Sequence, residues 1–373
     1  MDSRKRWCEF LIHDTSPALG EKAMTPPLRC RIWAVIAVSL AVASADTPLL
    51  AQGPTPQKLA PSYRDSLAQL STTIAEKYPT VRGLVVARGG CLVYEHYRFG
   101  GPEVRWPVYS VTKSVLSVLV GIAIDKGHLR LDQRLPELLP EIAGKVVDPR
   151  ASEITLRDLL TMTSGFEPVA PVEVPGVWNS DVWMANRRVK YAPGSHFEYD
   201  NPGADLISVI LERAVGEKVT NFARRELFAP LGIGPFEWMA DMDGHVPGQS
   251  GLRLTTRDMA KIGILHLQQG RWQGGQLIST AYVLDSTRKH NEGGEPVKAA
   301  YGYLWWKSND RSDAYFAAGA NSQLIYNVPG RNLVVALSST ASVPGGSQHF
   351  VNDVVLPAEA TLSAQAPCVD RLE

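Results

Sequence analysis

The sequence predicts an α/β protein in which a mostly helical lobe interrupts a lobe built on a β-sheet. β-rich runs occur near both ends of the chain, helical segments broken by proline and glycine fill the stretch between them, and a strongly apolar helix covers residues 111–126. We expect residues 62–130 and 240–373 to form the α/β lobe and residues 131–239 to form the helical lobe, both within one domain.

The first elements follow from periodicity. Residues 62–78 carry Leu67, Leu70 and Ile74 at helical spacing, which predicts an amphipathic helix. Residues 81–87 and 91–97 are short β-rich runs separated by an Arg-Gly-Gly turn, which predicts a hairpin. The apolar helix over residues 111–126 should end at Gly127.

Later elements are read in the same way. Helices are predicted over residues 155–161, 204–215 and 255–269, the last with Gly270 as its stop. Strands are predicted over residues 301–306, 324–328 and 333–338.

The N-terminal part has the pattern of a secretory signal. An apolar run of 11 residues, 32–42, follows Arg29 and Arg31 and precedes Ala43-Ser44-Ala45. It is shorter than the roughly 20 residues needed to span a bilayer. We therefore expect a signal segment over residues 1–45, a linker over 46–61, and a periplasmic or secreted protein without a stable membrane span; a short buried helix is the alternative. Because Met24 stands where such a signal would begin, residues 1–23 are read as an upstream start assigned in error.

Charge and cysteine content exclude several classes of function. The 38 basic and 38 acidic residues balance, so no basic face for nucleic acid is predicted. No Cys-x-x-Cys pair exists and the histidines do not cluster, so neither a metal nor another cofactor is expected. After export only Cys91 and Cys368 would remain, and in an oxidising compartment they could pair; one buried and one free cysteine is the other reading.

The chemistry centres on Ser110 and Lys113, which stand three residues apart at the start of the apolar helix. Positions i and i+3 share a helix face, so both groups can reach one point. A serine hydroxyl needs an adjacent base to become a nucleophile, and a lysine can serve where burial and a helix N-terminus favour its neutral form. The Ser110 backbone N–H would point toward an oxyanion formed there.

Ser286 and Lys289 have the same spacing. They follow a predicted helix and precede a polar loop, whereas Ser110 begins a buried helix. We therefore expect Ser110 to be the nucleophile.

A third candidate is Tyr199-Asp200-Asn201, which holds the chain's one Tyr-x-Asn. A tyrosine hydroxyl near the serine and lysine could carry a proton to the leaving group, and the asparagine amide could hold substrate or lysine. An ordinary half-buried tyrosine in a turn is the alternative.

These residues and several further motifs resemble those of a known family. From about residue 60 to residue 339 the chain resembles the penicillin-recognising serine hydrolases, which include class C β-lactamases, D-alanyl-D-alanine carboxypeptidases, esterases and nylon-oligomer hydrolases. The supporting motifs, in order, are VYSVTKS (108–114), ITLRDLLTMTSG (154–165), PG (193–194), YDN (199–201), PLG (230–232), SGLRLTTRD (250–258) and YGYLWW (301–306).

The resemblance implies a β-lactamase/transpeptidase-like fold, with an antiparallel sheet flanked by helices and an inserted, mostly helical lobe. It also implies Ser110 as the acylated nucleophile, Lys113 as its base and Tyr199 as the proton carrier.

The third family motif departs from the usual Lys-Thr-Gly or His-x-Gly, because Ala317-Ala318-Gly319 stands there. Ala317 cannot supply the cation that grips a substrate carboxylate. The Ala320 N–H after Gly319 can still be the second oxyanion donor. Two further departures concern the cleft. Asn321-Ser322 replaces a glycine pair, and Asp200 occupies a position that is commonly Ser or Ala. An Asp200 that faced the site would disfavour anionic substrates, and one on the other side of the turn would not.

The sequence thus predicts an exported serine hydrolase that cleaves small esters or amides through an acyl-enzyme. A β-lactamase or D-alanyl-D-alanine carboxypeptidase is the first alternative, and an inactive substrate-binding relative is the second.

Overall fold

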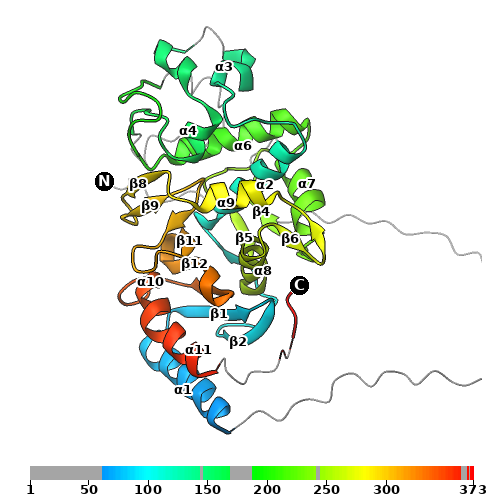
Figure 1. Ribbon diagram of the computed structural model, residues 1–373, viewed down its shortest axis with the longest axis vertical. Helices are drawn as coiled ribbons and strands as arrows, with labels where there is room; N and C mark the ends of the chain where they lie inside the picture. Colours follow the sequence, from blue (N-terminus) through cyan, green and yellow to red (C-terminus); the bar gives the residue numbers. More distant parts are fainter. Residues whose placement is uncertain (1–60, 143–145, 169–186, 241–243, 363–367, 369) are drawn as a thin grey trace, which may run out of the picture. The chain divides into compact units, whose positions relative to one another are not determined.

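An antiparallel sheet of eight strands is the central element of the structure, which is a computed structural model (Figure 1). It describes residues 61–142, 146–168, 187–240, 244–362, 368 and 370–373. The predicted signal segment and residues 46–60 of the predicted linker lie outside these residues. In spatial order the strands are β2 (Cys91–Tyr97), β1 (Val81–Arg88), β13 (Leu333–Ser339), β12 (Gln323–Val328), β11 (Tyr315–Gly319), β10 (Trp306–Lys307), β9 (Ala299–Tyr301) and β8 (Asn291–Gly294).

The sheet joins strands that are far apart in the sequence. The predicted hairpin is present as β1 and β2, and the turn uses Gly89 and Gly90 with φ of 56° and 77°, values that glycine adopts without strain. β1 also pairs with β13, so the N-terminal hairpin and the last strands lie in one sheet. β13 is buried along its whole length, which suits its run of branched apolar residues.

Helices cover both faces of the sheet. On one face, α8 (Thr256–Leu267) packs so closely that a Cβ on Gly263 would lie 2.6 Å from Val334. On the other face, Tyr326 of β12 lies 3.4 Å from Asn352 in η6 (Val351–Val355). η6 leads into α11 (Leu356–Leu362), which packs on α1 (Pro61–Lys77), and Figure 1 shows these two helices side by side.

Helix α2 (Val111–Asp125) is buried between the large sheet and other helices. All residues from 111 to 123 are buried, between β11 and β12 of the sheet and the helices α6 (Asn201–Val215) and α9 (Thr280–Thr287). The other helical elements are α3 (Leu135–Leu138), η1 (Pro140–Ile142), η2 (Pro149–Glu153), α4 (Leu156–Leu160), α7 (Val219–Ala223), η3 (Arg224–Phe228), η4 (Ala320–Ser322), η5 (Pro329–Arg331) and α10 (Ser347–Phe350).

Two small sheets complete the described fold. The first pairs β3 (Trp106–Pro107) and β4 (Glu237–Trp238) with β5 (Leu252–Leu254), and so ties the segment before α2 to the segment before α8. The second is the short ladder of β6 (Arg271–Trp272) and β7 (Gly275–Gln276).

The predicted fold class is confirmed, and the predicted helices match within three residues at each end. The single strand predicted over residues 301–306 is wrong. Those residues form the end of β9, a turn and the start of β10, and Leu304 at the turn has a φ of 58°. The turn leaves no mark in the sequence, because all six residues from 301 to 306 are buried and no polar residue interrupts the run.

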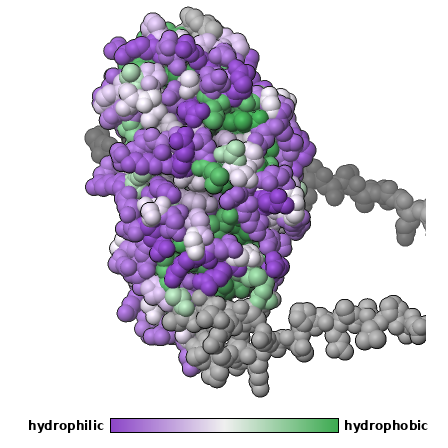
Figure 2. All heavy atoms as spheres, viewed as in Figure 1, coloured by the Kyte–Doolittle hydropathy of each residue, from purple (hydrophilic) through white to green (hydrophobic). Residues whose placement is uncertain are grey.

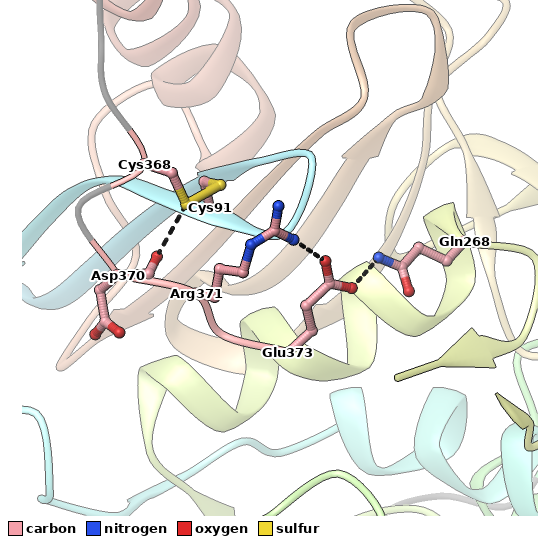
Figure 3. The surroundings of a disulfide bond; sticks show 6 residues. All are labelled: Cys91, Gln268, Cys368, Asp370, Arg371 and Glu373. Carbon is pink, nitrogen blue, oxygen red and sulfur yellow. Dashed lines mark hydrogen bonds and ion pairs between the residues drawn. A yellow bond between two sulfur atoms is a disulfide. The ribbon is translucent and has the colours of Figure 1, made fainter. Parts of the chain in front are cut away.

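A disulfide joins Cys91 of β2 to Cys368, so the pairing that the sequence left open is present (Figure 3). Residues 370–373 then run beside β2. The Leu92 N–H donates to the Asp370 carbonyl at 2.8 Å, and the Leu372 N–H donates to the Gly90 carbonyl at 3.0 Å.

Hydrophilic residues cover much of the face in Figure 2, with apolar residues gathered in separate patches. Within the described ranges, no helix has both the length and the apolar character needed to cross a bilayer.

Candidate active site

Ser110 stands at the head of α2, where a tight turn leaves the small sheet. The Val108 N–H donates to the Leu252 carbonyl at 3.0 Å, which fixes the turn to β5. Tyr109 has a φ of 47°, a left-handed conformation that is uncommon for a bulky residue. Strain of this kind gathers at functional sites, and here the turn delivers Ser110 as the N-cap of α2.

Lys113 lies beside it. Its Nζ is 3.0 Å from Ser110 Oγ and 3.0 Å from the Gln249 carbonyl oxygen. The lysine is only 2% exposed, so its amine is shielded from bulk water. The amine thus lies between the serine hydroxyl and a backbone carbonyl oxygen, within direct proton-transfer distance of the hydroxyl.

Tyr199 precedes α6 and faces the same lysine. Lys113 Nζ lies 4.9 Å from the Tyr199 ring centroid, so the contact that joins them is with the face of the ring. The ring stacks on Trp306 at 5.9 Å and 19°, and Trp306 also contacts Tyr301 edge-on. Burial, with a smaller contribution from Tyr199, raises the pKa of Tyr301 well above its ordinary value. These rings form an aromatic wall next to the amine.

Strand β11 ends against the turn that carries Ser110. A Cβ on Gly319 would lie 2.4 Å from the Val108 carbonyl oxygen and 3.1 Å from the Ser110 nitrogen. Only glycine permits this approach. Ala320 follows as the first residue of η4. The two main-chain segments thus meet where a pair of oxyanion donors is expected.

Asn321 and Ser322, which replace a glycine pair, adopt φ of 57° and 63°. Asn321 Nδ2 donates to the Tyr109 hydroxyl at 3.3 Å, and Ser322 Oγ accepts from the Val343 N–H at 3.0 Å. The polar pair keeps the left-handed backbone that glycine favours and adds side-chain contacts that glycine cannot make.

Asp200 is held by Arg187, a residue that the sequence analysis missed. Its two carboxylate oxygens accept from the guanidinium at 2.8 and 3.0 Å, and the side chains are 7% and 4% exposed. The guanidinium also lies 4.2 Å from the Phe166 ring centroid. The Asp200 charge is therefore neutralised and does not confront a substrate. The sequence did contain one indication: an acidic residue at a motif position that is commonly Ser or Ala favours a basic partner if it is buried.

Asn201 is the first residue of α6 and is partly exposed. Across the described part of the chain its amide makes no hydrogen bond to Ser110 or Lys113. It shares the turn that carries Tyr199.

The second Ser-x-x-Lys is not assembled as a site. Ser286 is fully buried in α9 and its hydroxyl donates to the Val283 carbonyl at 2.9 Å. Lys289 is 51% exposed and pairs with Glu292.

Comparison with known proteins agrees with this geometry. The sequence profile of the β-lactamase family matches residues 73–360. The chain belongs to the β-lactamase family. It is a hydrolase of the serine type that this family comprises.

Two curated relatives illustrate the family's range. The 6-aminohexanoate-dimer hydrolase of Paenarthrobacter ureafaciens is 26% identical over 280 residues, 68% of this chain and 71% of the relative. The D-alanyl-D-alanine-carboxypeptidase/endopeptidase AmpH of Escherichia coli (strain K12) is 30% identical over 138 residues, 34% of each. Among solved structures, a penicillin-binding protein homologue from Caulobacter crescentus superposes with a TM-score of 0.64 at 15% identity, covering 82% of this chain and 97% of that one. This likeness shows the fold.

Proposed function

We propose that this β-lactamase-family hydrolase cleaves small esters or amides with an uncharged acyl group, through an acyl-enzyme on Ser110. The observation that carries the proposal is the 3.0 Å separation of Lys113 Nζ and Ser110 Oγ at the head of a buried helix. A hydroxyl and a shielded amine at this distance can exchange a proton directly.

In the proposed reaction, Lys113 takes the Ser110 proton as Oγ attacks the substrate carbonyl carbon. The resulting oxyanion is held by the N–H groups of Ser110 and Ala320. Tyr199 passes a proton to the leaving oxygen or nitrogen as its bond to the acyl carbon breaks, and Lys113 gives Tyr199 the proton that it took from Ser110. Lys113 then takes a proton from a water molecule as the water oxygen attacks the acyl carbon, and that proton passes to Ser110 Oγ as the acid leaves. Asn201 is proposed to hold substrate from the same turn as Tyr199.

The charge pattern favours an uncharged acyl group. Ala317 on β11 is buried and offers a methyl group where the usual family motif has Lys or His. Asp200 is neutralised by Arg187, so no fixed charge attracts or repels an acyl side chain from that position. The stacked rings of Tyr199 and Trp306 suit an apolar acyl or leaving group. The likeness to 6-aminohexanoate-dimer hydrolase over most of both chains also supports a small substrate.

A β-lactamase or D-alanyl-D-alanine carboxypeptidase is the second candidate, favoured by the likeness to AmpH over a third of the chain. Ala317 argues against it, because both activities grip a substrate carboxylate. The assembled pair of Ser110 and Lys113 argues against an inactive binding relative.

We also propose that the protein is exported by the signal segment over residues 1–45 and acts in the periplasm or outside the cell. The Cys91–Cys368 disulfide supports this location, because disulfides persist in oxidising compartments.

The test is the intact mass of the purified protein after exposure to a fluorophosphonate probe. We expect one adduct, which is lost in Ser110→Ala and retained in the matched control Ser286→Ala. Short-chain esters and a chromogenic cephalosporin are then compared as substrates, with the esters expected to turn over faster. An adduct that survives Ser110→Ala would overturn the assigned nucleophile, and a preference for the cephalosporin would favour the second candidate. The same spectrum reports whether residues 1–45 are removed on export.

A further inference from the structure

A buried carboxylate contacts Gln249, the residue whose carbonyl oxygen contacts Lys113. Asp205 is in α6 and is 8% exposed. Its Oδ1 accepts the Gln249 backbone N–H at 3.0 Å, and its Oδ2 accepts the Gln249 side-chain amide at 2.7 Å. One carboxylate therefore holds both the main chain and the side chain of one residue.

Gln249 is the residue whose carbonyl oxygen accepts Lys113 Nζ at 3.0 Å. The loop that carries it lies directly on two helices, because a Cβ on Gly248 would lie 2.0 Å from the Ala204 carbonyl oxygen and 2.7 Å from Leu116. One turn further along α6, Ser208 Oγ donates to the Val246 carbonyl at 2.7 Å. Helix α6 thus fixes this loop through a hydroxyl and a carboxylate.

We propose that Asp205 is a positioning residue for the base: it fixes Gln249, and the Gln249 carbonyl in turn holds the Lys113 amine within reach of Ser110. A lysine side chain has four rotatable bonds, and burial alone does not select the rotamer that directs its lone pair at a hydroxyl. Reactions of this kind lose about a hundredfold when a reacting group is misplaced by about 1 Å. This inference rests on the proposed role of Lys113 as the base.

The surroundings make the contact sensitive to protonation. Burial raises the pKa of Asp205 to about 7 and Asp200 adds to the rise, whereas the Gln249 hydrogen bonds oppose it, as does Lys113 whenever its amine is protonated. An ionised carboxylate accepts both Gln249 donors, whereas a protonated one carries a hydrogen that competes with them. The hold on Gln249 is therefore strongest above neutral pH.

The experiment measures acylation of the full chain by a short-chain ester in Asp205→Asn. Asparagine keeps the size of the side chain but has one acceptor oxygen in place of two and no charge, so Gln249 is held by both contacts only if its side-chain amide turns its oxygen toward Nδ2. We expect kcat to fall by roughly tenfold to a hundredfold, with KM changed far less, because the base and not the substrate is displaced. We expect the wild-type pH–rate profile to have an inflection near pH 7 that is absent in the variant.

Two further variants separate positioning from general stability. Asp258→Asn removes an equally buried carboxylate, 8% exposed, which accepts the Thr255 N–H at 3.3 Å at the start of α8, and it should leave kcat and the pH profile unchanged. In Asp205→Asn/Gln249→Glu the donors and acceptors are exchanged, so both hydrogen bonds can re-form, and we expect most of the lost rate to return. If Asp205→Asn does not fold, Gln249→Met removes one of the two bonds and should lower kcat by a few-fold.

Wild-type kcat and an unchanged pH profile in Asp205→Asn, or in Gln249→Met when that variant is used, would overturn the inference, as would an exchange variant that recovers nothing. Failure of the proposed function looks different, because wild-type protein would then take up no fluorophosphonate at Ser110. If the probe reacts with Ser110 in Asp205→Asn but more slowly than in the wild-type protein, the result supports both the proposed function and the positioning role of Asp205.

Discussion

Replacing Asp200 by asparagine should destabilise the protein strongly, although the two side chains have nearly the same shape. The wild-type carboxylate meets Arg187 through two hydrogen bonds of 2.8 and 3.0 Å, and neither side chain is more than 7% exposed. Removing one partner of a buried ion pair costs about 3–5 kcal/mol, because the remaining charge stays out of water. Arg187 keeps the Glu167 carbonyl at 3.1 Å and the Phe166 ring, so we expect a loss near the lower end, about 3 kcal/mol.

The assay is urea denaturation followed by circular dichroism, with the free energy of unfolding compared between variants. Glu153→Gln is the matched control, since its partner Arg134 is 54% exposed and the acid 61%, and it should lose less than about 1 kcal/mol. The double variant Arg187→Met/Asp200→Leu should be more stable than Asp200→Asn, because no unpaired charge remains. An Asp200→Asn protein as stable as wild type would refute the argument that this pair is buried and mutually dependent.

Three other predictions follow from single contacts. Gly319→Ala places a Cβ 2.4 Å from the Val108 carbonyl oxygen and should reduce hydrolysis by at least tenfold, whereas Gly101→Ala, with open space around it, should be silent in the same ester assay. Asp205 has a folded-state pKa of about 7, well above its ordinary value, so the folded protein binds that proton more tightly than the unfolded chain does. The stabilisation of the folded state by this proton is fully present below about pH 4 and is lost as the pH rises through 7, by an upper limit of about 4 kcal/mol in the free energy of unfolding. A denaturation series across that pH range should show this decline in the wild-type protein and not in Asp205→Asn. The same decline in both proteins would contradict the prediction. Reducing the disulfide, which joins residues 277 apart, should lower the thermal midpoint, with a chain-entropy limit of roughly 5–6 kcal/mol; an unchanged midpoint in protein whose mass shows two free thiols would contradict this.

Local pattern was enough to predict the parts of the site that lie close together in the sequence. Ser110 and Lys113 are one helical turn apart, and the apolar run after them is long enough to indicate a buried helix. The hairpin and the last two strands were likewise predicted from β-rich runs and turn residues.

The groups that hold Lys113 and Asp200 in place could not be predicted in this way. Gln249 is 136 residues from Lys113 and 44 from Asp205, and a backbone carbonyl carries no signature in the sequence. Arg187 is one of two adjacent arginines, and only the folded chain shows that it meets Asp200. The turn at Leu304 was not predicted, because buried aromatic residues lie on both sides of it.

The disulfide also affects how the sheet meets other molecules. β2 is the outer strand on its side, and an uncovered outer strand offers unpaired amides and carbonyls to any other extended chain. Residues 370–373 occupy part of that edge, and Cys368 holds them there through Cys91. After reduction this cover of the edge would depend on its hydrogen bonds to β2 and the neighbouring turn and on the ion pair between Asp370 and Arg257, so the oxidation state of one bond bears on how firmly the edge is covered as well as on stability.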